Sequence, residues 1–187
     1  MNGIRLDRFE NGHWTRGRPI AVELLWILTS SLLVRSWLPG LLHRRFLLRL
    51  FGASIGRGVV IKPGVRVKFP WRLSVGDNSW IGEDAWIDNL APVKIGSNAC
   101  VSQGAYICTG SHDWSSETFD LITKPITIAD GAWVAAKSTV GPGVTVGEGA
   151  VLGLGSTASK NLDPWCIYSG SPAKFVKRRT LRPSVGD

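Results

Sequence analysis

Large aliphatic residues recur at every sixth position over more than half of the chain, beginning at residue 55. In seven of these units a glycine follows the aliphatic residue directly. Neither the helical period of 3.6 nor the two-residue alternation of an ordinary strand explains a period of six. The series consists of Ile55, Ile61, Val67, Val75, Ile81, Ile87, Ile95, Val101, Ile107, Ile128, Val134, Val140, Val146, Leu152 and Ala158.

A six-residue unit is too short for a strand and a return helix, so each unit is predicted to be a short strand and a bend. Three units then close one triangular turn, and strands of successive turns stack about 4.8 Å apart. The pattern therefore predicts an all-β protein, a parallel β-helix of about five triangular turns. We expect the coil over residues 53–165, an N-terminal helical segment over 1–52 and a short basic tail over 166–187.

The six-residue spacing is interrupted only after a third unit, and these interruptions locate one edge of the expected coil. The spacing rises to eight after Val67 and again after Ile87, and it rises to 21 after Ile107. All the extra residues should therefore leave the coil at one corner, as two short bulges and one long excursion. A loop of this length is uncommon in a compact fold unless it has a function. We expect a protruding functional loop over residues 108–127.

His112 is the candidate general base, because it lies at the root of this loop and is the only histidine of the repeat region. The bulge that contains Asp88 and Asn89 is expected at the same corner, one turn below. A carboxylate or an amide there could fix the tautomer of the imidazole or hold an acceptor hydroxyl. Alternatively, Asp88 and Asn89 only form the turn, for which both residue types are well suited.

The segment before the coil predicts two helices between residue 19 and about residue 52, broken at Pro39 and Gly40. Its longest apolar run, residues 24–34, is far shorter than the about 20 residues that a membrane-spanning helix needs. Capping of the exposed hydrophobic end of the coil is the role we favour. The alternative is peripheral contact of residues 19–52 with an anionic lipid surface, through Trp and Leu on one side and Arg on the other.

Composition limits the classes of binding partner and the cellular locations that we expect. A formal net charge of +8 favours an anionic partner, but the repeats contain no basic stripe with interleaved stacking aromatics, so nucleic acid is not expected. Cys100, Cys108 and Cys166 lack CxxC spacing, and three packed, reduced thiols suit a reducing cytoplasm. The first ten residues lack the features of a secretory signal. We expect a cytoplasmic protein, with the inner-membrane surface as the alternative location.

Several ordered motifs between residues 51 and 179 resemble the hexapeptide-repeat O-acetyltransferases. Within that class the chain is similar to the colanic acid biosynthesis acetyltransferases, and also to the maltose, galactoside and nodulation-factor acetyltransferases. The resemblance implies a left-handed coil that transfers an acetyl group from acetyl-CoA to a sugar hydroxyl, without a metal. The motifs are Gly-Ser-His-Asp at 110–113, Pro-Ile-Thr-Ile-Ala-Asp-Gly-Ala-Trp-Val at 125–134, Pro-Gly-Val-Thr-Val-Gly at 142–147 and Tyr-Ser-Gly-Ser-Pro-Ala-Lys at 168–174.

The resemblance also implies roles for individual residues. In these relatives the loop histidine, here His112, deprotonates the acceptor hydroxyl, which attacks the thioester directly. The tryptophan after the loop, here Trp133, lines the cleft, and the backbone N–H of Ala136 assists the thioester oxygen. Many relatives have Ser in place of Ala136, so a hydroxyl contribution is missing here. The remaining CoA contacts of the family, including cations that suit phosphates, correspond to Leu154, Ser159, Lys160, Lys174, Lys177 and Arg178.

Members of this class are trimers with each active site shared between two subunits, so the resemblance implies a homotrimer. Trp80, Trp86 and Trp133 occupy outward positions and would be covered by such an interface. The alternative is that they pack on the N-terminal helices or on the loop.

The acceptor is expected to be a sugar or a lipid-linked saccharide of exopolysaccharide or another surface glycan. The acceptor-binding region of the maltose-type relatives is not recognisable in residues 1–52, so the acceptor itself stays open. A nucleotide-sugar N-acyltransferase shares the coil, the histidine and CoA, and a non-catalytic scaffold shares the coil. A carbonic anhydrase with the same coil needs three zinc-binding histidines, whereas the repeats contain one.

Overall fold

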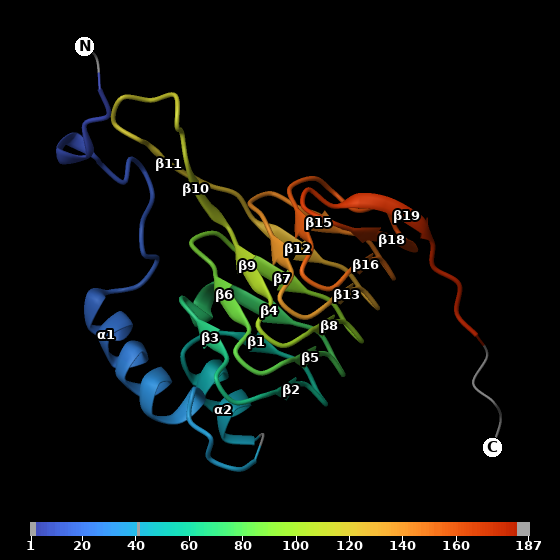
Figure 1. The fold of residues 1–187 in the computed structure, drawn as a ribbon. Helices are drawn as coiled ribbons and strands as arrows, with labels where there is room; N and C mark the ends of the chain where they lie inside the picture. Colours follow the sequence, from blue (N-terminus) through green and yellow to red (C-terminus); the bar gives the residue numbers. More distant parts are fainter. Residues whose placement is uncertain (1–2, 41, 183–187) are drawn as a thin grey trace.

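The chain winds into a coil whose short strands form three parallel sheets, with helices at its N-terminal end (Figure 1). The structure is a computed structural model, and it describes residues 3–40 and 42–182. Positions 1, 2 and 41 of the expected helical segment and positions 183–187 of the expected tail lie outside the described residues.

The three sheets are visited in the order A, B, C on each turn. Sheet A contains β1 (Ser54–Ile55), β4 (Leu73–Val75), β7 (Val93–Ile95), β12 (Ile126–Ile128) and β15 (Thr145–Val146). Sheet B contains β2 (Val60–Ile61), β5 (Trp80–Ile81), β8 (Cys100–Val101), β13 (Trp133–Val134), β16 (Val151–Leu152), β18 (Cys166–Ser169) and the antiparallel edge strand β19 (Lys174–Arg178). Sheet C contains β3 (Arg66–Val67), β6 (Trp86–Asp88), β9 (Tyr106–Cys108), β14 (Thr139–Val140) and β17 (Thr157–Ala158).

This order confirms the prediction of a left-handed parallel β-helix with five complete turns. Every aliphatic residue of the six-residue series is buried and belongs to a single core cluster. Smaller buried residues two positions earlier, such as Ala85, Ala99 and Ala132, fill the space near the corners. The core is therefore a column that runs along the coil axis.

Two of the three corners are tight turns with a repeated backbone conformation. One residue in each turn takes a left-handed φ, for example Asn78 at 58° and Asn98 at 53° between sheets A and B, and Asp84 at 58° between sheets B and C. Glycine, asparagine and aspartate tolerate this conformation best. The corner between sheets C and A carries the predicted interruptions, which are η3 (Pro70–Arg72), the bulge after β6 and the long excursion.

The N-terminal segment contains η1 (Leu6–Arg8), α1 (Ile20–Thr29), the π-helical turn η2 (Ser30–Val34) and α2 (Leu42–Leu50). Leu48 of α2 is fully buried within the coil's core cluster, so α2 covers the first turn. Helix α1 instead lies along the flank, where Trp26 donates from Nε1 to the Val67 carbonyl at 2.9 Å. No helix within the described residues is long and apolar enough to cross a membrane.

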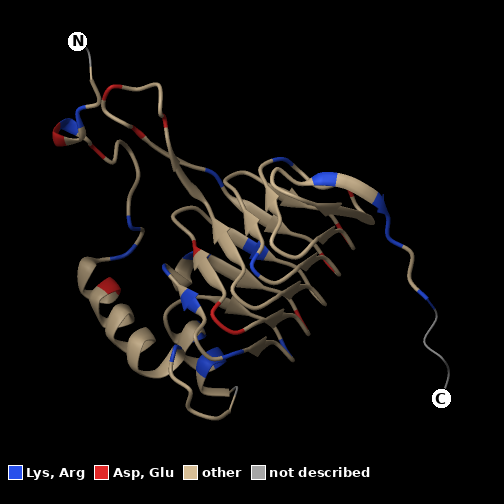
Figure 2. Ribbon diagram, in the orientation of Figure 1, with Lys and Arg blue, Asp and Glu red and all other residues tan. Residues whose placement is uncertain are grey.

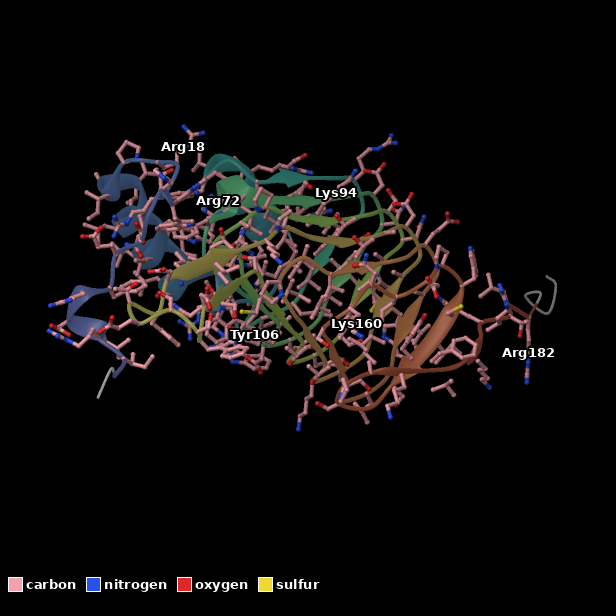
Figure 3. The ribbon with its side chains drawn as sticks, turned by 90° about the horizontal axis from the view of Figure 1, so that it is seen from above. Arg18, Arg72, Lys94, Tyr106, Lys160 and Arg182 are labelled. Atoms are coloured by element: carbon pink, nitrogen blue, oxygen red, sulfur yellow. The ribbon has the colours of Figure 1, made fainter. Side chains whose placement is uncertain are left out.

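The outward side chains of different sheets point in different directions, so the position of a residue in the repeat fixes its face. The view from above separates Lys94 of sheet A from Tyr106 of sheet C (Figure 3). Arg18 and Arg72 lie toward the side of Lys94 in the same view.

Candidate active site

The long excursion leaves the coil after β9 and forms an antiparallel hairpin of β10 (Gly110–His112) and β11 (Leu121–Thr123). His112, the predicted general base, is the strand partner of Leu121 at the outer end of this ladder. The tip beyond it is held by polar contacts, since Ser116 and Thr118 both donate from their hydroxyls to the Asp120 carboxylate, at 2.9 and 2.6 Å. The hairpin is therefore an ordered platform for the imidazole.

One ring nitrogen of His112 forms a hydrogen bond within the hairpin itself. Nδ1 lies 2.8 Å from the carbonyl oxygen of Phe119. A carbonyl only accepts hydrogen bonds, so Nδ1 carries the proton in the neutral ring and Nε2 retains its lone pair. This tautomer leaves Nε2 able to accept a proton from a substrate.

Phe119 also fixes the plane of the imidazole. The two rings stack with centroids 4.3 Å apart and an interplanar angle of 9°, and Phe9 approaches the imidazole from another direction at 5.6 Å. Phe119 has a φ of 54°, a conformation that a bulky residue rarely adopts. Phe119 was not among the residues predicted for the site, and its place in the long loop is the one signal that the sequence offers.

The N-terminal segment covers the same side of the hairpin. The backbone N–H of Arg5 donates to the Glu117 carbonyl at 2.8 Å, which attaches the segment to the hairpin tip. Further along, the Trp14 Nε1 donates to the Leu90 carbonyl at 2.8 Å. Residues 5–14 thus run along the corner between sheets C and A and bring Phe9 to His112.

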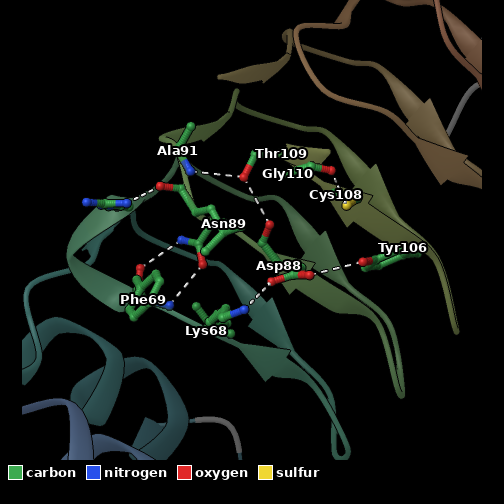
Figure 4. A network of polar contacts seen from close by, with 12 residues as sticks. Lys68, Phe69, Asp88, Asn89, Ala91, Tyr106, Cys108, Thr109 and Gly110 are labelled. Atoms are coloured by element: carbon green, nitrogen blue, oxygen red, sulfur yellow. Dashed lines mark hydrogen bonds and ion pairs between the residues drawn. The ribbon is translucent and has the colours of Figure 1, made fainter. Parts of the chain in front are cut away.

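Asp88 lies at the expected corner, but its carboxylate is engaged along the outer face of sheet C. Its Oδ2 accepts a hydrogen bond from the Tyr106 hydroxyl at 3.0 Å, and its Oδ1 lies 3.2 Å from Lys68 Nζ (Figure 4). Burial, with the neighbouring Cys108 and Asp88, raises the pKa of Tyr106, so the phenol remains a donor. Within the described residues Asp88 forms no hydrogen bond with His112.

Asn89 has a structural role. The side chain is completely buried, its Oδ1 accepts from the Phe69 N–H at 2.9 Å, and its Nδ2 donates to the Phe69 carbonyl at 2.7 Å (Figure 4). Both polar atoms therefore bridge to the turn below. The tautomer of His112 is set by the Phe119 carbonyl and not by either of the two residues that we predicted from the bulge.

Trp133 lies on the outer face of sheet B, beside a groove. Its ring is 43% exposed and its Nε1 donates to Ser102 Oγ at 2.9 Å. The groove has a volume of about 490 Å³ and is lined by Trp80, Cys100, Trp133 and Arg179, with the corner residues Asn78 and Asn98. Arg179 was not among the predicted residues; it donates from Nη1 to the carbonyls of Gly131 and Gly149, at 2.9 and 2.8 Å.

The other predicted CoA contacts fall on two corners of the upper coil. Ala136 and Leu154 lie on neighbouring turns between sheets B and C, where Gly155 donates to the Ala136 carbonyl at 3.0 Å. The N–H of Ala136 has no hydrogen-bond acceptor within the described residues. Ser159 and Lys160 are exposed at the corner between sheets C and A, two turns above the hairpin.

The basic tail is an exposed edge strand. Lys174, Lys177 and Arg178 belong to β19, which pairs with β18 at the end of sheet B, and all three side chains are exposed. In Figure 2 the edge strand β19 is blue at both of its ends. It belongs to the same sheet as β13, the strand of Trp133. The three cations give the end of sheet B an exposed positively charged edge.

One chain thus does not bring His112 together with Trp133 and Ala136, whereas Ser159 and Lys160 lie at the same corner as His112, two turns above it. His112 lies at the corner between sheets C and A, whereas Trp133 lies on sheet B and Ala136 at the corner between sheets B and C. Trp86 differs from the other outward tryptophans, because it is partly covered and stacks on Tyr106 at 4.6 Å. In residues 3–40 and 42–182, no group of three or more His, Cys, Asp or Glu side chains could hold a metal ion.

Comparison with known proteins identifies relatives of this chain by sequence. A family profile described as "Hexapeptide repeat of succinyl-transferase" matches residues 72–108. The Escherichia coli K12 protein named "Putative colanic acid biosynthesis acetyltransferase WcaF" is 41% identical over 165 residues, which cover 87% of this chain and 90% of that protein. The galactoside O-acetyltransferase of the same organism is 24% identical, over 72% of this chain and 68% of that protein.

Among solved structures, the hexapeptide-repeat acetyltransferase VCA0836 of Vibrio cholerae O1 biovar eltor, complexed with acetyl coenzyme A, superposes with a TM-score of 0.83. It is 20% identical in sequence, and the match covers 94% of this chain and 97% of that chain. This likeness shows the shared fold along nearly the whole chain.

Proposed function

Because this chain belongs to the hexapeptide-repeat acetyltransferases, we propose that it transfers the acetyl group of acetyl-CoA to a sugar hydroxyl, with His112 as the general base. The observation that carries the proposal is the hydrogen bond from Nδ1 to the Phe119 carbonyl. It leaves Nε2 as the basic atom on a hairpin that projects from the coil.

The reaction is a direct acyl transfer. Nε2 of His112 removes the proton from the acceptor hydroxyl as its oxygen attacks the thioester carbonyl carbon. The carbon–sulfur bond then breaks, and the imidazolium returns its proton to the departing thiolate. The products are an acetyl ester and free CoA, and no acyl-enzyme forms. Stacking on Phe119 holds the ring through both proton transfers.

The donor side of the site is proposed to lie on sheet B, on the corner between sheets B and C, and on Ser159 and Lys160 at the corner between sheets C and A. Trp133 provides an apolar wall, and the unpaired N–H of Ala136 is available to the developing oxyanion. Leu154 offers exposed apolar surface for pantetheine, while Lys160, Lys174 and Arg178 offer cations for the phosphates. Ser159 is proposed to contact the same cofactor arm from the neighbouring corner.

We propose that the working unit is a homotrimer in which the hairpin of one copy faces the donor surface of the next. The separation of His112 from Trp133 within one chain supports this arrangement. Exposed aromatic side chains on both surfaces support it too, since Trp80 is 58% exposed on sheet B and Trp114 is 83% exposed at the hairpin tip. A monodisperse monomer in sedimentation equilibrium would contradict this proposal.

A thiol-release assay tests the proposed reaction. The enzyme and acetyl-CoA are incubated with a panel of sugars, nucleotide sugars, amino sugars and lipid-linked oligosaccharides, and free CoA is measured with a thiol reagent. We expect release to require a hydroxyl acceptor and to fall by about 10²- to 10⁴-fold in His112→Ala, with an unchanged circular dichroism spectrum. Full activity in the variant would favour a non-catalytic imidazole, and turnover only with amino sugars would favour N-acylation.

A further inference from the structure

Helix α1 and the turn η2 are largely apolar on both their inner and their outer side, and their polar residues are Glu23, Thr29, Ser30 and Ser31. One row of side chains, Val22, Trp26 and Ser30, faces the coil at intervals of four residues, and Trp26 and Ser30 are buried. The opposite row also follows intervals of four, yet it consists of aliphatic residues that are exposed. We call this exposed surface the α1 face, and it comprises Ile20, Leu24, Leu25, Ile27, Leu28, Leu32 and Leu33.

The exposure of the α1 face is unusual for a helix that already packs on its own protein. A helix that is hydrophobic on all sides is ordinarily enclosed by protein or by lipid. Here protein covers one side only, and Leu24, Leu28 and Leu32 are about 60% exposed. A contiguous patch of this size marks an interaction surface.

Charge around the α1 face points to an anionic lipid surface as the occupant. Residues 11–52 contain six arginines and a single acidic residue, Glu23. Arg18 precedes the helix and Arg35 follows η2, so exposed cations bracket the apolar surface at both ends. Arg16 also precedes the helix, but it forms an ion pair with Glu23 at 2.8 Å. In Figure 2, α1 itself carries no blue between these ends. Trp37, the next aromatic residue, is 76% exposed and could anchor at the headgroup level.

The dimensions favour a helix that lies in the surface of a bilayer. α1 and η2 together are 15 residues long, which corresponds to about 22 Å at a helical rise and is shorter than the hydrocarbon core of about 30 Å. The helix is also fixed on its inner side, by the Trp26 hydrogen bond to Val67 and by Arg44, which donates to the carbonyls of Val34 and Gly40. The α1 face is therefore presented as a rigid surface.

We propose that the α1 face inserts among the headgroups of an anionic bilayer and docks the protein there as a peripheral membrane protein. This inference extends beyond the proposed acetyl transfer and does not depend on it. The aliphatic row supplies the apolar contact, and the flanking arginines supply attraction to negatively charged headgroups.

Flotation with lipid vesicles tests the proposal. The full chain is mixed with vesicles of phosphatidylethanolamine and phosphatidylglycerol, or with vesicles of phosphatidylcholine alone, and the vesicle-bound fraction is measured after centrifugation. We expect binding to the anionic vesicles, weaker binding to phosphatidylcholine, and a partial loss of binding between about 0.1 M and about 0.5 M salt.

The decisive variant is Leu24→Gln/Leu28→Gln/Leu32→Gln, because these exposed positions contribute little to the folded core. Each substitution is expected to weaken partitioning about tenfold, so the triple variant should not float measurably. The matched control, Ile4→Gln/Val176→Gln/Leu181→Gln, changes three exposed aliphatic residues elsewhere and should float like the wild type. Both variants should retain thiol release with a water-soluble acceptor.

Three results would overturn the proposal. In the first, the wild type does not float with anionic vesicles. In the second, the triple variant floats as well as the control. In the third, the triple variant floats like the wild type, but sedimentation shows that it no longer forms the wild-type oligomer. That result would assign the α1 face to a second copy of this chain. A wild type that floats with anionic vesicles but releases no thiol with any acceptor would instead contradict the proposed acetyl transfer and leave the docking proposal standing.

Discussion

The sequence predicts that Asn89 lies near His112, where it could act in catalysis, whereas its contacts indicate a structural role. The substitution Asn89→Ala distinguishes the two roles. The side chain is fully buried, and its amide forms two hydrogen bonds with the backbone of Phe69, at 2.9 and 2.7 Å. Phe69 is itself 1% exposed, so alanine leaves its buried N–H without an acceptor, while its carbonyl keeps one hydrogen bond, from the Arg72 N–H at 3.0 Å. This contact ties one turn of the coil to the next.

The expected cost follows from these two groups. Leaving the buried N–H unsatisfied costs about 1–3 kcal/mol and losing the second hydrogen bond costs about 1 kcal/mol, so we expect Asn89→Ala to lose about 2–4 kcal/mol of folding free energy. For a chain of this size each kcal/mol lowers Tm by about 2–4 °C, which gives a decrease of about 4–16 °C. Thermal unfolding at fixed protein concentration measures this decrease.

Asn161→Ala is the matched control. Asn161 also accepts from a backbone N–H, that of Thr145 at 2.8 Å, but it is exposed, so water replaces the lost contact and Tm should change little. Below its melting temperature, Asn89→Ala should keep kcat within about threefold of the wild type. An unchanged Tm combined with a hundredfold or greater loss of kcat would refute the structural role of Asn89.

Three further substitutions test individual contacts. Phe119→Ala removes the ring that stacks on His112, and should lower kcat about tenfold or more with little change in KM for acetyl-CoA, as measured by thiol release. Arg179→Ala removes two hydrogen bonds to carbonyls in the Trp133 groove, and should raise KM for acetyl-CoA and lower Tm together. Tyr106→Phe removes the hydroxyl that donates to Asp88; it should cost about 1 kcal/mol in urea unfolding while leaving thiol release unchanged, and a large activity loss would place Asp88 in catalysis.

Sequence reasoning succeeded where a position in the repeat determines the structure. A residue at the aliphatic position of any unit must face the axis, so the whole buried series follows from its period of six. The interruptions after Val67, Ile87 and Ile107 place the hairpin and both bulges at one corner for the same reason. The family resemblance added the handedness of the coil, which the period does not specify.

The contacts of the candidate site depend on side-chain directions that the period does not determine. Asp88 and Asn89 are neighbours in the chain, yet one reaches Tyr106 on the outer face and the other turns into the interior. The partner of His112 is a carbonyl seven residues later in its own hairpin, and its position depends on the left-handed backbone of Phe119. No repeat extends into the hairpin, so no pattern could have placed these atoms.

The N-terminal segment shows a similar limit. The sequence offered capping or lipid contact for residues 19–52 as alternatives, and the structure assigns different environments to the two helices. Leu48 of α2 enters the core, whereas Leu28 of α1 stays exposed. Both residues are leucines in helices of the same arginine-containing segment, and the structure distinguishes them by their packing.

Subunit complementation tests most directly the claim that His112 of one copy acts at the donor surface of another. His112→Ala and Trp133→Ala are each expected to be inactive or nearly so, and the two chains are co-expressed with different tags and purified as mixed oligomers. With random assembly, one interface in four combines an intact His112 with an intact Trp133, so thiol release should recover to about a quarter of the wild-type rate per site. Mixed oligomers no more active than either parent would contradict a shared site and place the complete site within a single chain.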